Sequence, residues 1–352
     1  MSNPLITPAP RPEPAAPSTT LPDDWRQWVA ENRLRGCTPE SMLQVLLAND
    51  LDRSASEAAL VAIERDPSYL AALKFLQLYG KLASVMLNHQ RLVQSAPHYE
   101  RVEKRAHVSR DEFTERYVRG SRPLVLTELA RDWPALGRWS PADLKQRFGH
   151  AEVEIQSGRQ ADAQYEQNKL ALRRTVRLGD FVDQVVAGGP TNDHYLTANN
   201  EVLRRPEFAP LLDDIGSLPD YCDRAQLAAR SSFWFGPGGT VTPLHHDTIM
   251  LMHTQVVGRK RWRFISPLET PRLYNFNGVF SQVDLDRPDL ARYPLFGEAT
   301  VLDIVLEPGE TIFLPLGWWH HVTSLELSLS FSFSNLAVPN EFEYLNPSIT
   351  NW

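Results

Sequence analysis

The sequence predicts a mainly β protein with an added helical domain, in which the β part folds as an antiparallel barrel or double-sheet jelly roll. Three observations support this fold class. Helical periodicity dominates residues 23–96, short β-rich runs separated by turn residues dominate residues 97–352, and LELSLSFSFS at 325–334 alternates almost strictly between apolar and serine residues. We therefore expect a leader over residues 1–22, then a helical domain, then a β-barrel domain.

The leader is rich in Pro, Ala and Thr and offers almost nothing to bury, so we expect it to be disordered. The whole chain has 352 residues, 42% of them hydrophobic, which suffices for a substantial core. Its net charge of -7 argues against a protein that binds nucleic acid or anionic membranes.

Cysteine usage and the lack of export signals indicate a cytoplasmic protein. The two cysteines, Cys37 and Cys222, lie far apart without CxxC spacing, which fits a reducing compartment and disfavours a zinc-thiolate site. No apolar run approaches the roughly 20 residues of a membrane span, and the N-terminus lacks a secretory signal. We expect no membrane association.

Four helices are expected in the helical domain, residues 23–96. Thr38 is placed to cap the second helix, and Ser54 with Glu57 has the spacing of a capping box for the third. The fourth is the long apolar segment YLAALKFLQLYGKLASVMLNHQRLV at residues 69–93. This domain is either a docking module for a partner or a brace packed on the rest of the chain.

The alternating segment 325–334 is expected to be a strand with one apolar face and one small polar face. Successive side chains on a strand point to opposite sides, so serines share one face. Small polar residues facing the interior of a barrel would leave room for a ligand. The serines concerned are Ser328, Ser330, Ser332 and Ser334, opposite Leu325, Leu327, Leu329, Phe331 and Phe333.

The stretch VTPLHHDTIM at residues 241–250 offers candidate metal ligands. On a strand, His245 and Asp247 point the same way and His246 faces away. A later strand start, LPLGWWHHV, supplies a third ligand from its doubled histidine, either His320 or His321. Two histidines and one carboxylate on one face of a metal leave positions open, which is typical of non-haem Fe(II) oxygenases and unlike closed zinc sites.

Several separated segments resemble the Jumonji C hydroxylases, the cupin-like branch of Fe(II) and 2-oxoglutarate dioxygenases. They are SRPLVLTELARDWPALGRWS, FWFGPGGTVTPLHHD, QVVGRKRWRFISP and LPLGWWHHVTSLELSLSFSFS, and the resemblance covers residues 97–336. It implies a double-stranded β-helix and an enzyme that uses Fe(II), 2-oxoglutarate and O2 to hydroxylate a C–H bond, with a protein or peptide as substrate. It also implies that His245, Asp247 and His320 hold the iron, with His321 pointing away.

The resemblance also suggests how 2-oxoglutarate would be held. Its far carboxylate needs a buried cation, and Lys260 lies 15 positions after His245, as a lysine does in family members. Lys260 shares strand parity with Trp262 and Phe264, an apolar face, whereas its neighbours are ordinary surface arginines. Further contacts implied by the resemblance are the hydroxyls of Tyr195 and Thr242, the indole of Trp234, and Ser332.

One position departs from the family pattern. Many relatives carry an asparagine six residues after the first iron histidine, where this chain has Leu251. His253 has the same strand parity, so it either supplies polarity to the co-substrate pocket or is a core histidine with its hydrogen bonds satisfied. The co-substrate contacts are therefore expected to differ in detail from those of relatives, while the metal ligands are unaffected.

Two other functions compete with the dioxygenase. One is a metal-dependent cupin that acts on a small metabolite without 2-oxoglutarate, which would have no need of a buried Lys260. The other is a non-catalytic scaffold whose helical domain binds a partner. An intact set of His245, Asp247 and His320 argues against the scaffold.

Overall fold

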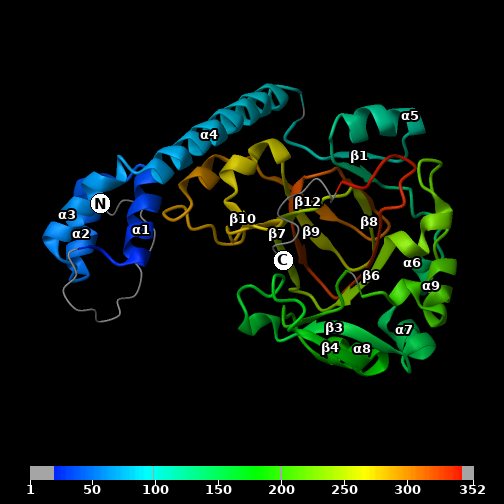
Figure 1. Ribbon diagram of the computed structural model, residues 1–352. Coiled ribbons are helices and arrows are strands. Elements are labelled where there is room, and N and C mark those ends of the chain that lie inside the picture. The colour runs from blue at the N-terminus through cyan, green and yellow to red at the C-terminus, as the bar shows by residue number, and fades with distance from the viewer. Residues whose placement is uncertain (1–19, 98, 199, 343–352) are drawn as a thin grey trace. The chain divides into compact units, whose positions relative to one another are not determined.

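The computed structural model describes residues 20–97, 99–198 and 200–342, in two compact units (Figure 1). The first unit contains Met1–Arg91 with Asp289–Gly297, and the second contains Leu92–Pro288 with Glu298–Trp352. Most of the leader expected over residues 1–22 lies outside the described residues. Near its end, however, Leu21 is buried in the core of the helical unit, so the segment that buries nothing is shorter than predicted.

The first unit is built from four helices, as predicted. The apolar faces of the first three helices meet in one cluster around two tryptophans, whose rings are in edge contact with centroids 5.6 Å apart. The helices are α1 (Asp23–Leu34), α2 (Pro39–Ala48), α3 (Arg53–Ile63) and α4 (Pro67–Gln94). The main core residues are Trp25, Trp28, Val29, Met42, Leu46 and Leu60.

Capping explains where two of these helices begin. The Thr38 hydroxyl accepts a hydrogen bond from the backbone N–H of Ser41 at 3.2 Å, as the sequence indicated. At α3 the predicted Ser54 cap is wrong. The Asp52 carboxylate caps this helix by accepting from the backbone N–H of Ala55 at 2.8 Å, and its negative charge also suits the positive end of the helix.

Helix α4 differs from the other three in its exposure. Of its 28 residues only Tyr69 and Gln90 are buried. By length and composition alone it could cross a membrane, although Lys74 and Lys81 interrupt its apolar sequence. The expectation that the protein does not associate with membranes stays a prediction.

The second unit contains two six-stranded sheets and a small three-stranded sheet. The first large sheet has the order β1 (Glu103–Arg105), β2 (Leu124–Leu126), β13 (Thr311–Leu314), β8 (Leu251–Val257), β15 (Ser328–Phe333) and β6 (Ser231–Gly236). The second has the order β10 (Asn275–Asn277), β11 (Phe280–Ser281), β7 (Val241–His246), β14 (Trp319–Ser324), β9 (Lys260–Ile265) and β12 (Leu302–Leu306). The small sheet has the order β4 (Arg173–Arg177), β3 (Glu152–Ser157) and β5 (His194–Tyr195).

The two large sheets form a jelly-roll barrel, so the predicted fold class is confirmed. All pairings within them are antiparallel except β1 with β2. Residues from both sheets, on β6, β7, β8, β9, β14 and β15, line one cavity, which places the inner faces of the sheets opposite each other.

Apolar and serine side chains alternate along β15, so one face of the strand packs in the core and the other faces the cavity. Its apolar residues Leu329, Phe331 and Phe333 join the largest apolar cluster, where the Phe331 ring lies 5.9 Å from that of Trp133. The serine face is turned the other way. The helical segments that carry or flank this cluster are α5 (Arg110–Glu112), a π-helix (Phe113–Arg119), α6 (Ala135–Arg138), α7 (Pro141–Phe148), α8 (Leu178–Ala187) and α9 (Ala209–Asp213).

Candidate metal and co-substrate site

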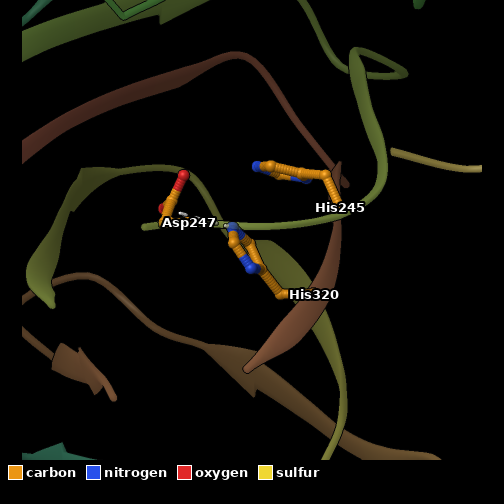
Figure 2. A group of neighbouring side chains, drawn as sticks. All are labelled: His245, Asp247 and His320. Carbon is orange, nitrogen blue, oxygen red and sulfur yellow. Dashed lines mark ion pairs between the residues drawn. The ribbon is translucent and has the colours of Figure 1, made fainter. Parts of the chain in front are cut away.

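Three side chains from β7, the turn after it and β14 converge in the barrel (Figure 2). His245, Asp247 and His320 each offer a ligand atom, and these atoms all lie within 4.8 Å of one another. The Nε2 atom of His320 is 3.7 Å from Oδ2 of Asp247, and the two imidazole centroids are 4.0 Å apart. Two nitrogen donors and one carboxylate oxygen at this spacing match the donor set of a metal site with open positions.

Strand pairing explains why these residues meet. His245 on β7 lies directly opposite His320 on the antiparallel strand β14. The pairing slips by one residue between His320 and Val322, which is a β-bulge. Asp247 follows β7 by one residue, and its carbonyl accepts a hydrogen bond from the N–H of Gly317 at 3.2 Å. This bond ties the turn that carries Asp247 to the loop preceding β14.

Both histidines are oriented by the backbone of their own strands. The Nδ1 atom of His245 lies 2.7 Å from the carbonyl oxygen of Pro243, and Nδ1 of His320 lies 3.0 Å from that of Trp318. A carbonyl only accepts, so each Nδ1 carries the proton and each Nε2 is left with a free lone pair. This is the tautomer that a metal ligand requires, held by the kind of supporting hydrogen bond found around metal sites.

The electrostatics of the cluster also suit a cation. Burial raises the pKa of Asp247 above its ordinary value, and burial holds the pKa of His320 well below its usual range. Within the described part of the chain, no lysine or arginine forms an ion pair with Asp247. A half-buried carboxylate beside the neutral His320 imidazole is costly unless a cation meets it, and a divalent metal would do so.

The neighbouring histidines face other groups. The ring of His246 packs edge-on against Trp319 at 4.7 Å. His321 is buried next to Arg263, which lies 3.0 Å from its Nδ1, and its Nε2 lies 3.4 Å from Asp286. The structure therefore brings His320, and not His321, to His245 and Asp247.

Lys260 is fully buried at the beginning of β9. Its ammonium donates hydrogen bonds to the hydroxyls of Tyr195, at 3.0 Å, and Ser330, at 2.8 Å, and it lies 5.5 Å from the ring centroid of Trp234. No carboxylate in the described ranges pairs with it. Burial lowers the pKa of Lys260 to about 7. An unpaired buried ammonium of this kind fits an anionic ligand group.

The other residues implied by the resemblance also border this space. Trp234 donates from its indole N–H to the Ser332 hydroxyl at 2.8 Å. Thr242 lies on β7, three residues before His245, and Tyr195 is buried on β5. Residues that line the same cavity of about 500 Å³ as the three candidate metal ligands include Lys260, Tyr195, Trp234, Thr242, Ser332, His253, Leu251 and Trp262.

His253 is buried on β8 at the position where its side chain borders the cavity. Its ring is 4.9 Å from that of Trp262, and its Nε2 has no hydrogen-bond partner within the described residues. Burial and the nearby Lys260 charge hold the pKa of His253 well below its usual range. Its hydrogen bonds are thus not all satisfied by the protein, which fits a ligand contact better than a core histidine.

Sequence reasoning missed two features of the site. Ser330, which lies on the predicted serine face but was not singled out, accepts a hydrogen bond from Lys260. Arg159 is buried 5.4 Å from the ring of Tyr195 and pairs with Glu166 at 2.9 Å, and Glu166 lines the cavity. Arg159 follows Gly158, whose φ of 86° marks a tight turn, but no spacing in the sequence connected this turn to the barrel.

Comparison with protein families agrees with this geometry. Residues 109–339 match the family model described as "Cupin-like domain". The chain is 33% identical over 233 residues to "Lysine-specific demethylase 8" of Xenopus tropicalis, covering 64% of this chain and 50% of that protein. It is also 33% identical over 249 residues to "Lysine-specific demethylase JMJ30" of Arabidopsis thaliana, covering 66% and 54%.

A further relative carries a different name. The chain is 28% identical over 222 residues to human "HSPB1-associated protein 1", covering 58% of this chain and 45% of that protein. This chain thus spans about half the length of the curated relatives it matches. The residues matched by the family model, 109–339, include strands β2 to β15 and the candidate site.

Proposed function

From the premise that the chain belongs to the cupin-like domain family, whose Jumonji C members are Fe(II)- and 2-oxoglutarate-dependent oxygenases, we propose that it hydroxylates a C–H bond on a protein or peptide side chain. One observation carries the proposal. A single cavity joins a His, Asp, His cluster to a buried ammonium without a carboxylate partner among the described residues.

Two groups of residues would bind the iron and the co-substrate of the proposed reaction. His245, Asp247 and His320 would hold Fe(II), and Lys260 with Tyr195 would neutralise and orient the far carboxylate of 2-oxoglutarate. When bound, the iron and 2-oxoglutarate supply the oxidation of an unactivated C–H bond by O2, with loss of CO2 from the co-substrate.

Apolar side chains around the cluster would keep water away from the reacting groups. The Trp262 ring is stacked on His320, with centroids 5.8 Å apart and an angle of 18°, and the Phe280 ring lies 5.7 Å from that of His245. Desolvation strengthens the electrostatic contacts within such a site and suppresses side reactions. The substrate side chain would enter the cavity near Val279 and Phe280, which line it beside the metal cluster.

The buried Lys260 favours a dioxygenase over a metabolite cupin. A cupin that does not use 2-oxoglutarate gains nothing from an unpaired ammonium in the barrel, and burying one is costly. The names of two relatives support a protein lysine as substrate, because both are called lysine-specific demethylases. Hydroxylation of an N-methyl group releases that group as formaldehyde, so demethylation and hydroxylation would use the same site.

The test is turnover of 2-oxoglutarate with candidate peptides. Purified protein is incubated with Fe(II), ascorbate, 2-oxoglutarate and methylated or unmethylated peptides, and succinate and peptide masses are measured. A gain of one oxygen would indicate hydroxylation, and loss of a methyl group with formaldehyde would indicate demethylation. Iron binding without any 2-oxoglutarate binding would favour the metabolite cupin, and failure to hold iron would favour the scaffold.

A further inference from the structure

The proposed function makes no use of helix α4, although α4 carries a large exposed apolar surface. Its exposed apolar residues include Phe75 (74% exposed), Val85 (67%), Leu82 (57%) and Leu78 (54%). Most of the stability of a helix in a protein comes from packing its apolar face, and clustered exposed apolar residues mark an interaction surface. The surface formed by these four residues, called the α4 seam below, therefore needs a partner.

The spacing of the α4 seam indicates what kind of partner fits. Successive members are separated by three, four and three residues, and the same rhythm continues through His89 to Leu92. Apolar residues at alternating intervals of three and four occupy the a and d positions of a coiled-coil heptad. The seam suits a second helix with the same repeat, and α4 of another copy of this chain has that repeat.

We propose that the chain is a homodimer in which the α4 seams of two copies pair as a parallel coiled coil. The charges of the helix select the parallel orientation. Helix α4 contains Lys74, Lys81 and Arg91 but no Asp or Glu. With Phe75 at position a, the two lysines occupy position g, while Tyr79 and Met86 occupy position e.

In a parallel pair, each g residue lies beside an e residue of the other helix. Lys74 and Lys81 would then extend over Tyr79 and Met86 of the second copy, where the lysine stems pack and an ammonium can meet an aromatic ring. An antiparallel pair would instead place g beside g and bring lysines together, which is unfavourable.

The size of the surface also suits a dimer. With Tyr79 at position e and Leu92 at the next position d, the seam offers on the order of 700 Å², close to the roughly 800 Å² that each partner buries in a stable interface. A membrane-spanning role for α4 would place Lys74 and Lys81 within the hydrocarbon region, which is costly. The regular heptad spacing favours a second copy of the chain over a lipid bilayer.

The decisive measurement is the mass of the full-length chain in solution, by light scattering and sedimentation. We expect a dimer for the wild type and a monomer for Leu78→Glu/Leu82→Glu, which places two carboxylates in the seam. The matched control is Gln77→Glu/Ser84→Glu, which adds the same charge to the same helix at position c and should remain dimeric. Circular dichroism checks that each variant is folded.

Three results would overturn the dimer. They are a wild type that is monomeric at about 100 µM, a seam variant that remains dimeric, and a control that dissociates as readily as the seam variant. Flotation of a monomeric wild type with phosphatidylcholine and phosphatidylserine vesicles would assign the surface to a membrane instead. None of the seam residues lines the cavity, so iron and 2-oxoglutarate binding by a monomeric variant tests the proposed function separately.

A cysteine at position a tests the orientation. Position a faces itself in a parallel pair, so Leu82→Cys should form an intermolecular disulfide under mild oxidation. Ser84→Cys, on the outer side of the helix, should not, and the wild type reports any background from Cys37 and Cys222. A dimer of Leu82→Cys that fails to cross-link would contradict the parallel arrangement.

Discussion

At the scale of single residues, the neighbouring histidines of β14 differ in the groups that their side chains contact. His320 reaches the metal cluster, and His321 reaches Asp286 and Arg263. We expect His245→Ala, Asp247→Ala and His320→Ala each to lose Fe(II) affinity, because two remaining donors hold a metal weakly. His246→Ala and His321→Ala are expected to retain it. Calorimetric titration with Fe(II) under nitrogen measures both sets, and loss of metal in His321→Ala but not His320→Ala would contradict the assignment.

Lys260 is expected to control the affinity for 2-oxoglutarate. Lys260→Met leaves the far carboxylate buried without a cation, which costs roughly 3 to 5 kcal/mol and corresponds to a loss of at least about a hundredfold in affinity. Iron binding should persist. Arg261→Met is the matched control, because Arg261 is the next residue on β9 and forms its ion pair with Asp303 at the surface. Equal affinities of Lys260→Met and wild type would remove Lys260 from the site.

Because of Lys260, the affinity for 2-oxoglutarate is expected to depend on pH. Its pKa of about 7 means that the ammonium is present below pH 7 and increasingly lost above it. Since 2-oxoglutarate binds the protonated form, its affinity should fall by up to about tenfold per pH unit as the pH rises from 7 to 9, with uptake of a proton. Lys260→Arg stays charged and should bind more weakly but without this slope. Titrations in buffers of different ionisation enthalpy measure the proton uptake, and a flat wild-type profile would contradict the prediction.

At the scale of strands, the sequence predicts which side chains share a face but not how strands pair. The convergence of His245 with Asp247, and the inward direction of Lys260, follow from the period of two within a strand. The choice between His320 and His321 depends on a bulge in the pairing of β14 with β7, which no local pattern specifies. The family resemblance, and not the residues alone, selected His320.

Contacts between the two sheets were harder still to predict. Ser330 meets Lys260 although β15 and β9 belong to different sheets, so their alignment depends on how the sheets stack. A further bulge between Leu329 and Ser330 shifts the pairing of β15 with β8. Arg159 was missed for a similar reason, since its turn reaches the barrel through contacts distant in sequence.

The turn between β8 and β9 carries a testable structural constraint. Gly258 has a φ of 70°, and a Cβ added there would lie 2.1 Å from the backbone oxygen of Leu327. Gly258→Ala should therefore lower the free energy of unfolding by roughly 2 to 4 kcal/mol. Gly80→Ala, where nothing lies within 4 Å and the backbone is helical, should be neutral or slightly stabilising. Chemical denaturation compares the two, and similar stabilities would contradict the constraint.

At the scale of the whole molecule, the two compact units have separate apolar cores. The first core is built around Trp25 and Trp28, and the metal cluster lies wholly in the second unit. Calorimetric unfolding is expected to show that Fe(II) with 2-oxoglutarate raises the transition of the second unit, by about 2.7 kcal/mol at a hundred times the dissociation constant, and leaves the first unchanged. Trp28→Ala should do the reverse and lower only the first transition. A single transition shifted by both changes would show that the units unfold together.

The hydrogen bonds from His245 to the carbonyl of Pro243 and from His320 to that of Trp318 have an evolutionary consequence. A carbonyl is present whatever side chain its residue carries, so the orientation of both imidazoles is independent of amino-acid identity at these two supporting positions. Side chains around the cavity can therefore be exchanged, and new substrates acquired, without rebuilding the metal centre. The orientation of the two imidazoles is therefore robust to substitution at positions 243 and 318, although the ligands themselves are not replaceable.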